Sequence, residues 1–261
     1  MNKTKIDWCD STWNPVTGCL HGCKYCYARI IAERFNGNIT GVETVKRIAG
    51  GRMLWDLSEP IRKIDGKISA YPCGFIPTFH RYRLNDYIDK KDRNIFVCSM
   101  ADLFGEWVPE SWIDEIFNVC EKATQHNYLF LTKNVERYCT LECGLPDGDN
   151  MWYGTSITKE NEVSRFDLLP AFRKKFVSIE PILEDLNIKH YNVMLHQIDW
   201  VIIGAETGRR KDKVVPERKW IEDIVNECRS AYYPVPVFMK SSLADIWGEP
   251  LIQEFPKELK R

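Results

Sequence analysis

The sequence predicts an α/β fold, a partial or complete barrel of parallel strands surrounded by helices. From about residue 94 onward, short apolar runs alternate with amphipathic stretches. Each run is rich in β-branched and aromatic residues and ends in polar or small ones, which is typical of buried parallel strands. Repeated strand–helix–strand units imply right-handed crossovers, and about seven strands suit an open or closed barrel.

The expected strands follow the chain in order. The first is expected around residues 12–17, TWNPVT, just before a cysteine-rich loop. The six later apolar runs are residues 94–100, 128–133, 151–157, 175–181, 199–206 and 235–241. In a parallel barrel, all of these strands end at the edge where ligands bind.

Amphipathic stretches between the strands predict helices. Ser111 is expected to cap the first, over residues 111–123. Its apolar face consists of Trp112, Ile113, Ile116, Phe117 and Cys120. Residues 217–231 repeat the pattern, and shorter helical stretches follow Asn134 and Asn161.

Residues 36–93 interrupt this rhythm. The segment contains several glycines, three prolines and the turn YPCGFIP. We expect an insertion after the cysteine loop that covers the barrel mouth. No sharp domain boundary is visible, so residues 1–261 are expected to form one domain.

Composition sets the broad class. Hydrophobic residues make up 44% and charged residues 28%, as in ordinary globular proteins, and the net charge is -1. No stretch approaches the ~20 apolar residues that cross a membrane. The N-terminal residues MNKTKIDW contain no apolar signal segment, so we expect a reducing cytoplasmic location.

Three cysteines, Cys19, Cys23 and Cys26, occur in the run GCLHGCKYCYAR. Neighbouring soft thiolates favour zinc or iron–sulfur centres. A closed site takes four protein ligands, so three thiolates predict a [4Fe–4S] cluster with one open iron. The alternative is a structural zinc site with His21 as fourth ligand, although His21 is only two residues from Cys19 and from Cys23.

The cysteines outside this loop give no clear indication of a second metal site. Cys139 and Cys143 form a C-x3-C pair with no third ligand nearby, which argues against an auxiliary cluster. Cys98, Cys120 and Cys228 fall in apolar patterns and are expected to pack as small hydrophobic residues. The role of Cys73 is open.

Polar residues gather where the expected strands end. They are Ser99, Asp102, Lys133, Ser156, Thr158, Glu180, Glu206 and Lys240. Because parallel strands end at one edge, these side chains are expected to line a common pocket. A hydrolase that uses Glu180 and Glu206 would fit the pocket but would leave the cysteine loop unexplained.

The cysteine spacing C-x3-C-x2-C, with aromatic Tyr25 before the last thiol, resembles the signature of radical S-adenosylmethionine (SAM) enzymes. That resemblance implies a [4Fe–4S] cluster whose open iron chelates the amino and carboxylate groups of SAM. It also implies reductive cleavage of SAM, usually to a 5′-deoxyadenosyl radical, and an external electron donor such as a flavodoxin or ferredoxin-like protein.

Segments along nearly the whole chain resemble a narrower family, the phage-associated three-cysteine proteins that are radical-SAM-like. They are TWNPVTGC, the cysteine loop, PTFHRYRL, IFVCSMADLFGEWVPESWID, LFLTKNVERY, MWYGTSIT, KFVSIEPIL, DWVIIGAETG and VFMKS. This chain has a shorter first cysteine gap than many relatives. It has Gly204-Ala205 where they usually carry a glycine pair, and Arg81 where they carry proline. A looser likeness is to spore photoproduct lyase.

These resemblances imply roles for the strand-end residues. Tyr25 would pack by the cluster and the adenine. Ser99 or Asp102 would meet the SAM ammonium, and Lys133 its carboxylate. Ser156, Glu180 or Glu206 would bind the ribose hydroxyls. His80, Arg81 and Lys240 are expected to contact substrate.

The substrate is predicted less sharply than the cofactors. Residues 81–93 and 208–219 mix basic with acidic residues, and the first holds tyrosines that could stack on bases. A nucleic acid or nucleotide is therefore one expectation, and a small metabolite or peptide is the alternative. A non-catalytic zinc-binding interaction module is the remaining alternative.

Overall fold

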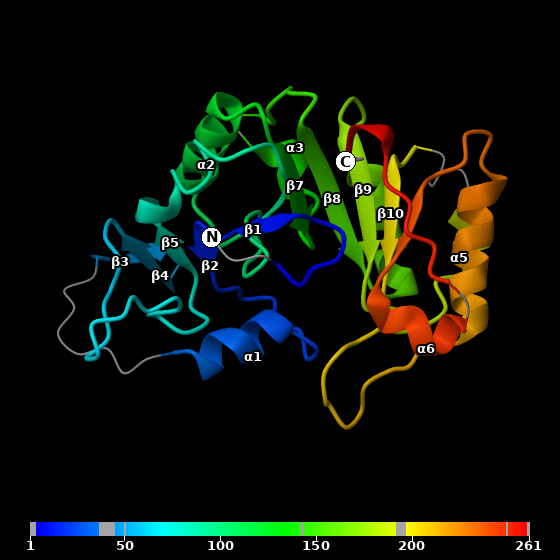
Figure 1. The fold of residues 1–261 in the computed structure, drawn as a ribbon, viewed down its shortest axis with the longest axis horizontal. Helices are drawn as coiled ribbons and strands as arrows, with labels where there is room; N and C mark the ends of the chain where they lie inside the picture. Colours follow the sequence, from blue (N-terminus) through cyan, green and yellow to red (C-terminus); the bar gives the residue numbers. More distant parts are fainter. Residues whose placement is uncertain are drawn as a thin grey trace.

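Seven parallel strands form a half-barrel in which neighbouring strands follow one another in chain order (Figure 1). The computed structural model describes residues 4–36, 45–49, 51–141, 144–191, 197–248 and 250–259. The strands are β1 (Ser11–Trp13), β6 (Asn94–Val97), β7 (Asn127–Thr132), β8 (Met151–Ile157), β9 (Lys174–Ile179), β10 (Trp200–Ile203) and β11 (Val237–Met239). The predicted parallel α/β partial barrel is confirmed.

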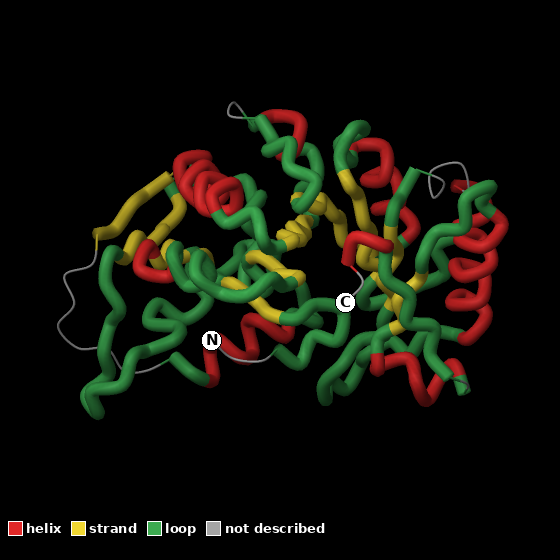
Figure 2. The backbone as a smooth tube through the Cα atoms, turned by 45° about the horizontal axis from the view of Figure 1, so that its top comes forward, coloured by secondary structure: helices red, strands yellow, loops and turns green. Residues whose placement is uncertain are grey.

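Helices cover the outer side of this sheet (Figure 2). The larger ones are α2 (Glu110–Lys122) and α5 (Arg218–Ser230), and their apolar faces are buried as predicted. The other helical segments among the described residues are α1 (Tyr27–Arg34), η1 (Arg81–Arg83), α3 (Arg137–Thr140), η2 (Glu160–Leu168), η3 (Ile188–Tyr191), η4 (Ser241–Leu243), α6 (Ala244–Trp247) and η5 (Lys257–Leu259). The predicted cap at Ser111 is wrong. Pro109 occupies the N-cap position, and Ser111 lies inside the first turn.

The inner side of the half-barrel is filled by aromatic residues from successive strands. This cluster includes Trp8, Phe96, Trp152, Phe176, Trp200 and Phe238. The rings of Trp8 and Phe96 lie 4.7 Å apart, centroid to centroid. Gly154 makes room for this packing, because a Cβ there would lie 2.5 Å from the Phe176 ring. The apolar cluster closes the barrel below the carboxyl ends of the strands.

Alternation along the strands then places polar residues above that cluster. Ser156 follows Trp152 by four residues, and Ser178 follows Phe176 by two, so each shares a face with its aromatic neighbour. The register pairs Ser156 with Ser178 across β8 and β9. The inner face therefore changes from apolar to polar towards the carboxyl edge.

A second sheet stands beside the half-barrel. Its strands, in spatial order, are β2 (Val16–Thr17), β5 (Thr78–His80), β4 (Arg52–Leu57) and β3 (Val45–Ala49). Three of its strands come from residues 36–93. The single strand expected at residues 12–17 is divided at Asn14 and Pro15 into β1 and β2, which belong to different sheets.

No helix in the described part of the chain has both the length and the apolar character that spanning a bilayer requires.

Candidate active site

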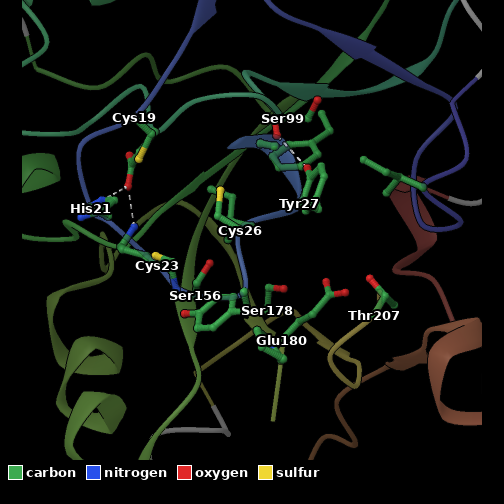
Figure 3. Close-up of a pocket in the computed structure, with 18 of the residues that line it drawn as sticks. Cys19, His21, Cys23, Cys26, Tyr27, Ser99, Ser156, Ser178, Glu180 and Thr207 are labelled. Carbon is green, nitrogen blue, oxygen red and sulfur yellow. Dashed lines mark hydrogen bonds and ion pairs between the residues drawn. The ribbon is translucent and has the colours of Figure 1, made fainter. Parts of the chain in front are cut away.

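The carboxyl ends of the strands open into a pocket of about 200 Å³ (Figure 3). The cysteine loop and the start of α1 form one wall, and the ends of the later strands form the other. Predicted site residues that line it are Cys19, Cys23, Tyr25, Cys26, Ser99, Asp102, Lys133, Ser156, Glu180, Glu206 and Lys240. This edge is where ligands bind in parallel α/β folds.

The cysteine loop (residues 18–26) begins at a glycine with strict steric limits. Gly18 has φ = 88°, and a Cβ there would lie 2.3 Å from the carbonyl oxygen of Ile76. Its N–H donates to the carbonyl of Met100 at 2.9 Å, and the Cys19 N–H donates to Phe75 at 3.3 Å. The first thiol is thus fixed against two separate chain segments.

Cys26 occupies the N-cap position of α1, where its Sγ accepts the Arg29 N–H at 3.4 Å. The backbone N–H groups of a helix start favour a negatively charged partner. The fold therefore offers a favourable electrostatic setting for a thiolate at the third cysteine.

Cys19 and Cys26 are partly buried in the pocket wall. Burial raises the pKa of Cys19 to about 12, and burial also raises the pKa of Cys26. Metal binding would displace their protons, as it does at thiolate sites in general.

The pocket offers three cysteine thiols as donors to a soft metal centre. Cys19, Cys23 and Cys26 are free thiols that line one pocket. Within the described ranges, no three His, Cys, Asp or Glu side chains converge as ligands of a single metal ion. Three thiolates are the protein ligands of a [4Fe–4S] cluster with one open iron, whereas a closed zinc site needs a fourth ligand.

His21, the proposed fourth zinc ligand, is engaged elsewhere. Its Nε2 lies 2.7 Å from Oδ2 of Asp102, and its ring packs edge-on against Trp107 with centroids 4.9 Å apart. The residue thus ties the cysteine loop to the segment after β6.

Asp102 joins three parts of the site. Besides His21, its carboxylate accepts the Thr132 hydroxyl at 2.7 Å, the Lys133 N–H at 2.9 Å and the Phe104 N–H at 3.1 Å. The side chain is buried. A buried carboxylate is stable when it is hydrogen-bonded to this extent, so Asp102 holds the loop and the end of β7 together.

Lys133, unlike Asp102, has a side-chain charge that no hydrogen bond within the described part of the chain satisfies. Its Nζ is buried and has no hydrogen-bond partner among the described residues. The ammonium lies 5.5 Å from the ring centroid of Tyr25, at the pocket wall. A buried cation without a partner is costly, so this atom is suited to an anionic ligand that enters the pocket.

Ser99 is fixed by residues on both sides of the pocket. Its hydroxyl donates to Asn14 Oδ1 at 3.1 Å, and its carbonyl accepts the Tyr27 hydroxyl at 2.7 Å. Tyr27 is 46% exposed and lines the pocket.

The opposite wall carries a paired carboxylate and ammonium. Glu180, after β9, contacts Lys240, after β11, through Oε1 and Nζ. Gly204 makes room for this pair, since a Cβ there would lie 3.1 Å from Lys240 and 3.2 Å from Glu180. Ser156 and Ser178 lie in the same wall (Figure 3).

Glu206 ends this wall and is held by Arg210. Both carboxylate oxygens accept guanidinium hydrogen bonds of 2.7 Å, from Nε and Nη2. The hydrogen bonds from Arg210 lower the pKa of Glu206, so this carboxylate is ionised at neutral pH.

Two predicted substrate contacts are not brought to the pocket. His80 is buried in the second sheet between the Thr17 hydroxyl (2.9 Å) and the Tyr82 hydroxyl (3.1 Å). Burial lowers its pKa well below the usual range. Arg81 forms two hydrogen bonds with Asp56 and a further one with Glu115.

Among the described residues, Cys73 and Cys139 do not line the pocket. Cys73 is partly buried, and burial raises its pKa to about 11. Cys139 is exposed, and its predicted partner Cys143 lies outside the described residues.

Some lining residues were not predicted from the sequence. They include Tyr27, Phe75, Ser178 and Thr207. Ser178 could have been found by alternation, because it precedes Glu180 by two residues on an expected strand. Phe75 carried no such signal.

Comparisons with known proteins agree with this arrangement. The family described as "Protein of unknown function (DUF5131)" matches residues 3–253. No curated protein matches the sequence.

Among solved structures, spore photoproduct lyase complexed with dinucleoside spore photoproduct is 9% identical with a TM-score of 0.55. A mutant of that enzyme with the same ligand is 10% identical with a TM-score of 0.58. Each match covers 92% of this chain and 79% of the other. This likeness shows that the chain shares the half-barrel fold of those structures.

Proposed function

The chain belongs to the DUF5131 family and has the half-barrel fold of radical SAM enzymes, and from these premises we propose that it is itself a radical SAM enzyme. The observation that carries the proposal is the meeting of three free thiols and one unpartnered buried ammonium in a single pocket. Cys19, Cys23 and Cys26 would hold a [4Fe–4S] cluster. That group, when bound, supplies the electron for reductive cleavage of SAM.

The residues around the cluster would bind and orient SAM. Lys133 would form a charge-assisted hydrogen bond with its carboxylate, and Tyr25 would pack against its adenine. Ser99 is the better candidate for the ammonium, because the carboxylate of Asp102 already accepts four hydrogen bonds. Ser156, Glu180 or Glu206 would bind the ribose hydroxyls. The aromatic residues beneath would exclude water.

We propose a nucleotide or nucleic acid as substrate. Support comes from the similar structures, which were solved with a dinucleoside ligand. Lys240 lies in the wall opposite the cysteine loop and would contact the substrate rather than the cluster. An external flavodoxin or ferredoxin-like protein would supply electrons. The proposal includes the expectation that the insertion at residues 36–93 covers the pocket.

Anaerobic reconstitution with iron and sulfide tests the cluster. The wild-type protein should turn brown, bind iron and sulfide, and cleave SAM after reduction. The variant with Cys19, Cys23 and Cys26 all replaced by alanine should do none of these. Replacing Cys73 and Cys139 with alanine instead is the matched control and should leave the iron content unchanged. One zinc per chain without iron or sulfide would overturn the proposal.

A further inference from the structure

Cations flank the pocket mouth on two sides, and we infer that they hold the phosphate backbone of a single-stranded nucleic acid across it. The helix rim consists of Lys24, Arg29 and Arg34, and the loop rim of Arg209, Lys211 and Lys213. The inference rests on the proposed function, because it assigns a polymeric substrate to the same pocket.

Each rim is continuous in sequence with residues that line the pocket. Tyr27 and Ala28, in the first turn of α1, line the pocket, and so does Thr207, at the start of the loop after β10. Figure 1 shows α1 and this gold loop extending beyond the same ends of the strands. A strand bound to both rims would therefore pass over the mouth.

The loop-rim cations are free to bind an external anion. Within the ranges that the structure describes, no carboxylate forms an ion pair with Arg209, Lys211 or Lys213. Arg210 differs, because Glu206 holds it against the wall. Since the net charge of the chain is only -1, the excess of cations here is local.

The helix rim is also weakly paired. Arg29 meets Glu33 at 3.8 Å, where both side chains are largely exposed, and such pairs contribute little. Aromatic residues adjoin these cations: Tyr27 is 46% exposed and Phe35 is 50% exposed. Cations that follow a backbone beside exposed rings on which bases stack are typical of single-strand binding surfaces.

The arginines of the other basic segment, residues 81–93, are bound within the protein and are not available to a nucleic acid. Within residues 81–93, Arg83 donates to the carbonyls of Asn14 (3.0 Å) and Ala70 (2.8 Å), and Arg93 donates to the Ser11 hydroxyl (3.0 Å). With Arg81 bound to Asp56, the arginines of this segment serve the fold.

Fluorescence anisotropy with a labelled oligothymidylate tests the inference on cluster-free protein. The test variant combines Arg209→Gln, Lys211→Gln and Lys213→Gln. The matched control replaces three exposed lysines near the opposite edge of the sheet, Lys90→Gln, Lys91→Gln and Lys257→Gln. We expect wild-type affinity to fall steeply with salt. Each lost phosphate contact should reduce the slope of log K against log salt by about 0.7, so the loop-rim variant should lose about 2.

The control variant should keep the wild-type slope. Equal losses in both variants, binding that salt does not change, or equal competition by thymidine monophosphate would overturn the inference. Circular dichroism of each variant establishes that it is folded. Because binding is measured without the cluster, a failure here is distinguishable from a failure of iron binding, which would count against the proposed enzyme instead.

Discussion

Asp102, which follows β6, and Lys133, which follows β7, have different roles in the pocket. The carboxylate of Asp102 accepts hydrogen bonds from His21, Thr132, Lys133 and Phe104, so it organises the protein. The Lys133 Nζ is buried without a partner in the described part of the chain. Its charge is therefore available to a ligand, whereas that of Asp102 is not.

Replacing Lys133 with methionine should separate ligand binding from folding. The variant removes an unpartnered buried cation and keeps an apolar stem of similar length, so the free energy of unfolding should rise or stay the same. Binding of SAM to the reconstituted protein should weaken by about 10- to 100-fold, as expected when a charge-assisted hydrogen bond worth about 1.5–3 kcal/mol is lost. Calorimetric titration and urea unfolding measure the two effects.

Lys90→Met, at an exposed position, serves as the control and should leave SAM binding unchanged. If Lys133→Met destabilised the protein strongly and bound SAM normally, Lys133 would have a structural role instead.

Gly18 and Gly22 provide a matched pair in the cysteine loop. Both have positive φ, 88° and 70°, but only Gly18 has backbone where a Cβ would lie. Gly22→Ala should cost about 1–2 kcal/mol for the left-handed conformation. Gly18→Ala should cost more, because the carbonyl of Ile76 must also move, and it should reduce the iron content on reconstitution. Equal unfolding free energies for the two variants would contradict this.

At the scale of elements, the apolar runs and amphipathic helices were predictable because their patterns reflect burial directly. Two strand bounds differ from the expectation. The expected strand at residues 12–17 divides because Pro15 has no N–H, and because Asn14 Oδ1 accepts the Ser99 hydroxyl and the Met100 N–H. β6 ends at Val97 because Cys98 turns with φ = 57°.

The pocket was predictable where residues follow strands, and less so elsewhere. Ser156, Glu180 and Lys240 lie at one edge for topological reasons. His80 and Arg81 share the basic and aromatic character of ligand-binding residues, yet the second sheet uses them internally. Composition does not distinguish a cation that binds substrate from one that pairs with Asp56. Only the tertiary contacts do so.

The apolar interior of the half-barrel leads to a prediction about β8 and β9. Gly154→Ala would place a methyl group 2.5 Å from the Phe176 ring. Such overpacking should cost about 1–3 kcal/mol in the free energy of unfolding. Adding Phe176→Leu should restore part of the loss, so the two changes together should cost less than their sum. Urea unfolding of the four proteins in this cycle measures the coupling, and strict additivity would contradict the packing account.

At the scale of the whole molecule, the pocket joins parts of the chain that are far apart in sequence. The cysteines come from residues 19–26, Lys133 follows the third strand of the half-barrel, and Lys240 follows the last. Ligands that contact all three therefore bind only the folded chain. Their binding free energy should appear as global stability.

The stabilisation by SAM should depend on the cluster. At a SAM concentration about 100 times its dissociation constant, the reconstituted protein should gain about 2.7 kcal/mol in the free energy of unfolding. The variant that lacks all three loop cysteines should gain much less, because Lys133 and the strand-end polar groups would act without the open iron. Anaerobic denaturant unfolding with and without SAM measures both gains. Equal gains would mean that SAM binds this pocket independently of the cysteine loop, and the proposed coupling between cluster and cofactor would then be wrong.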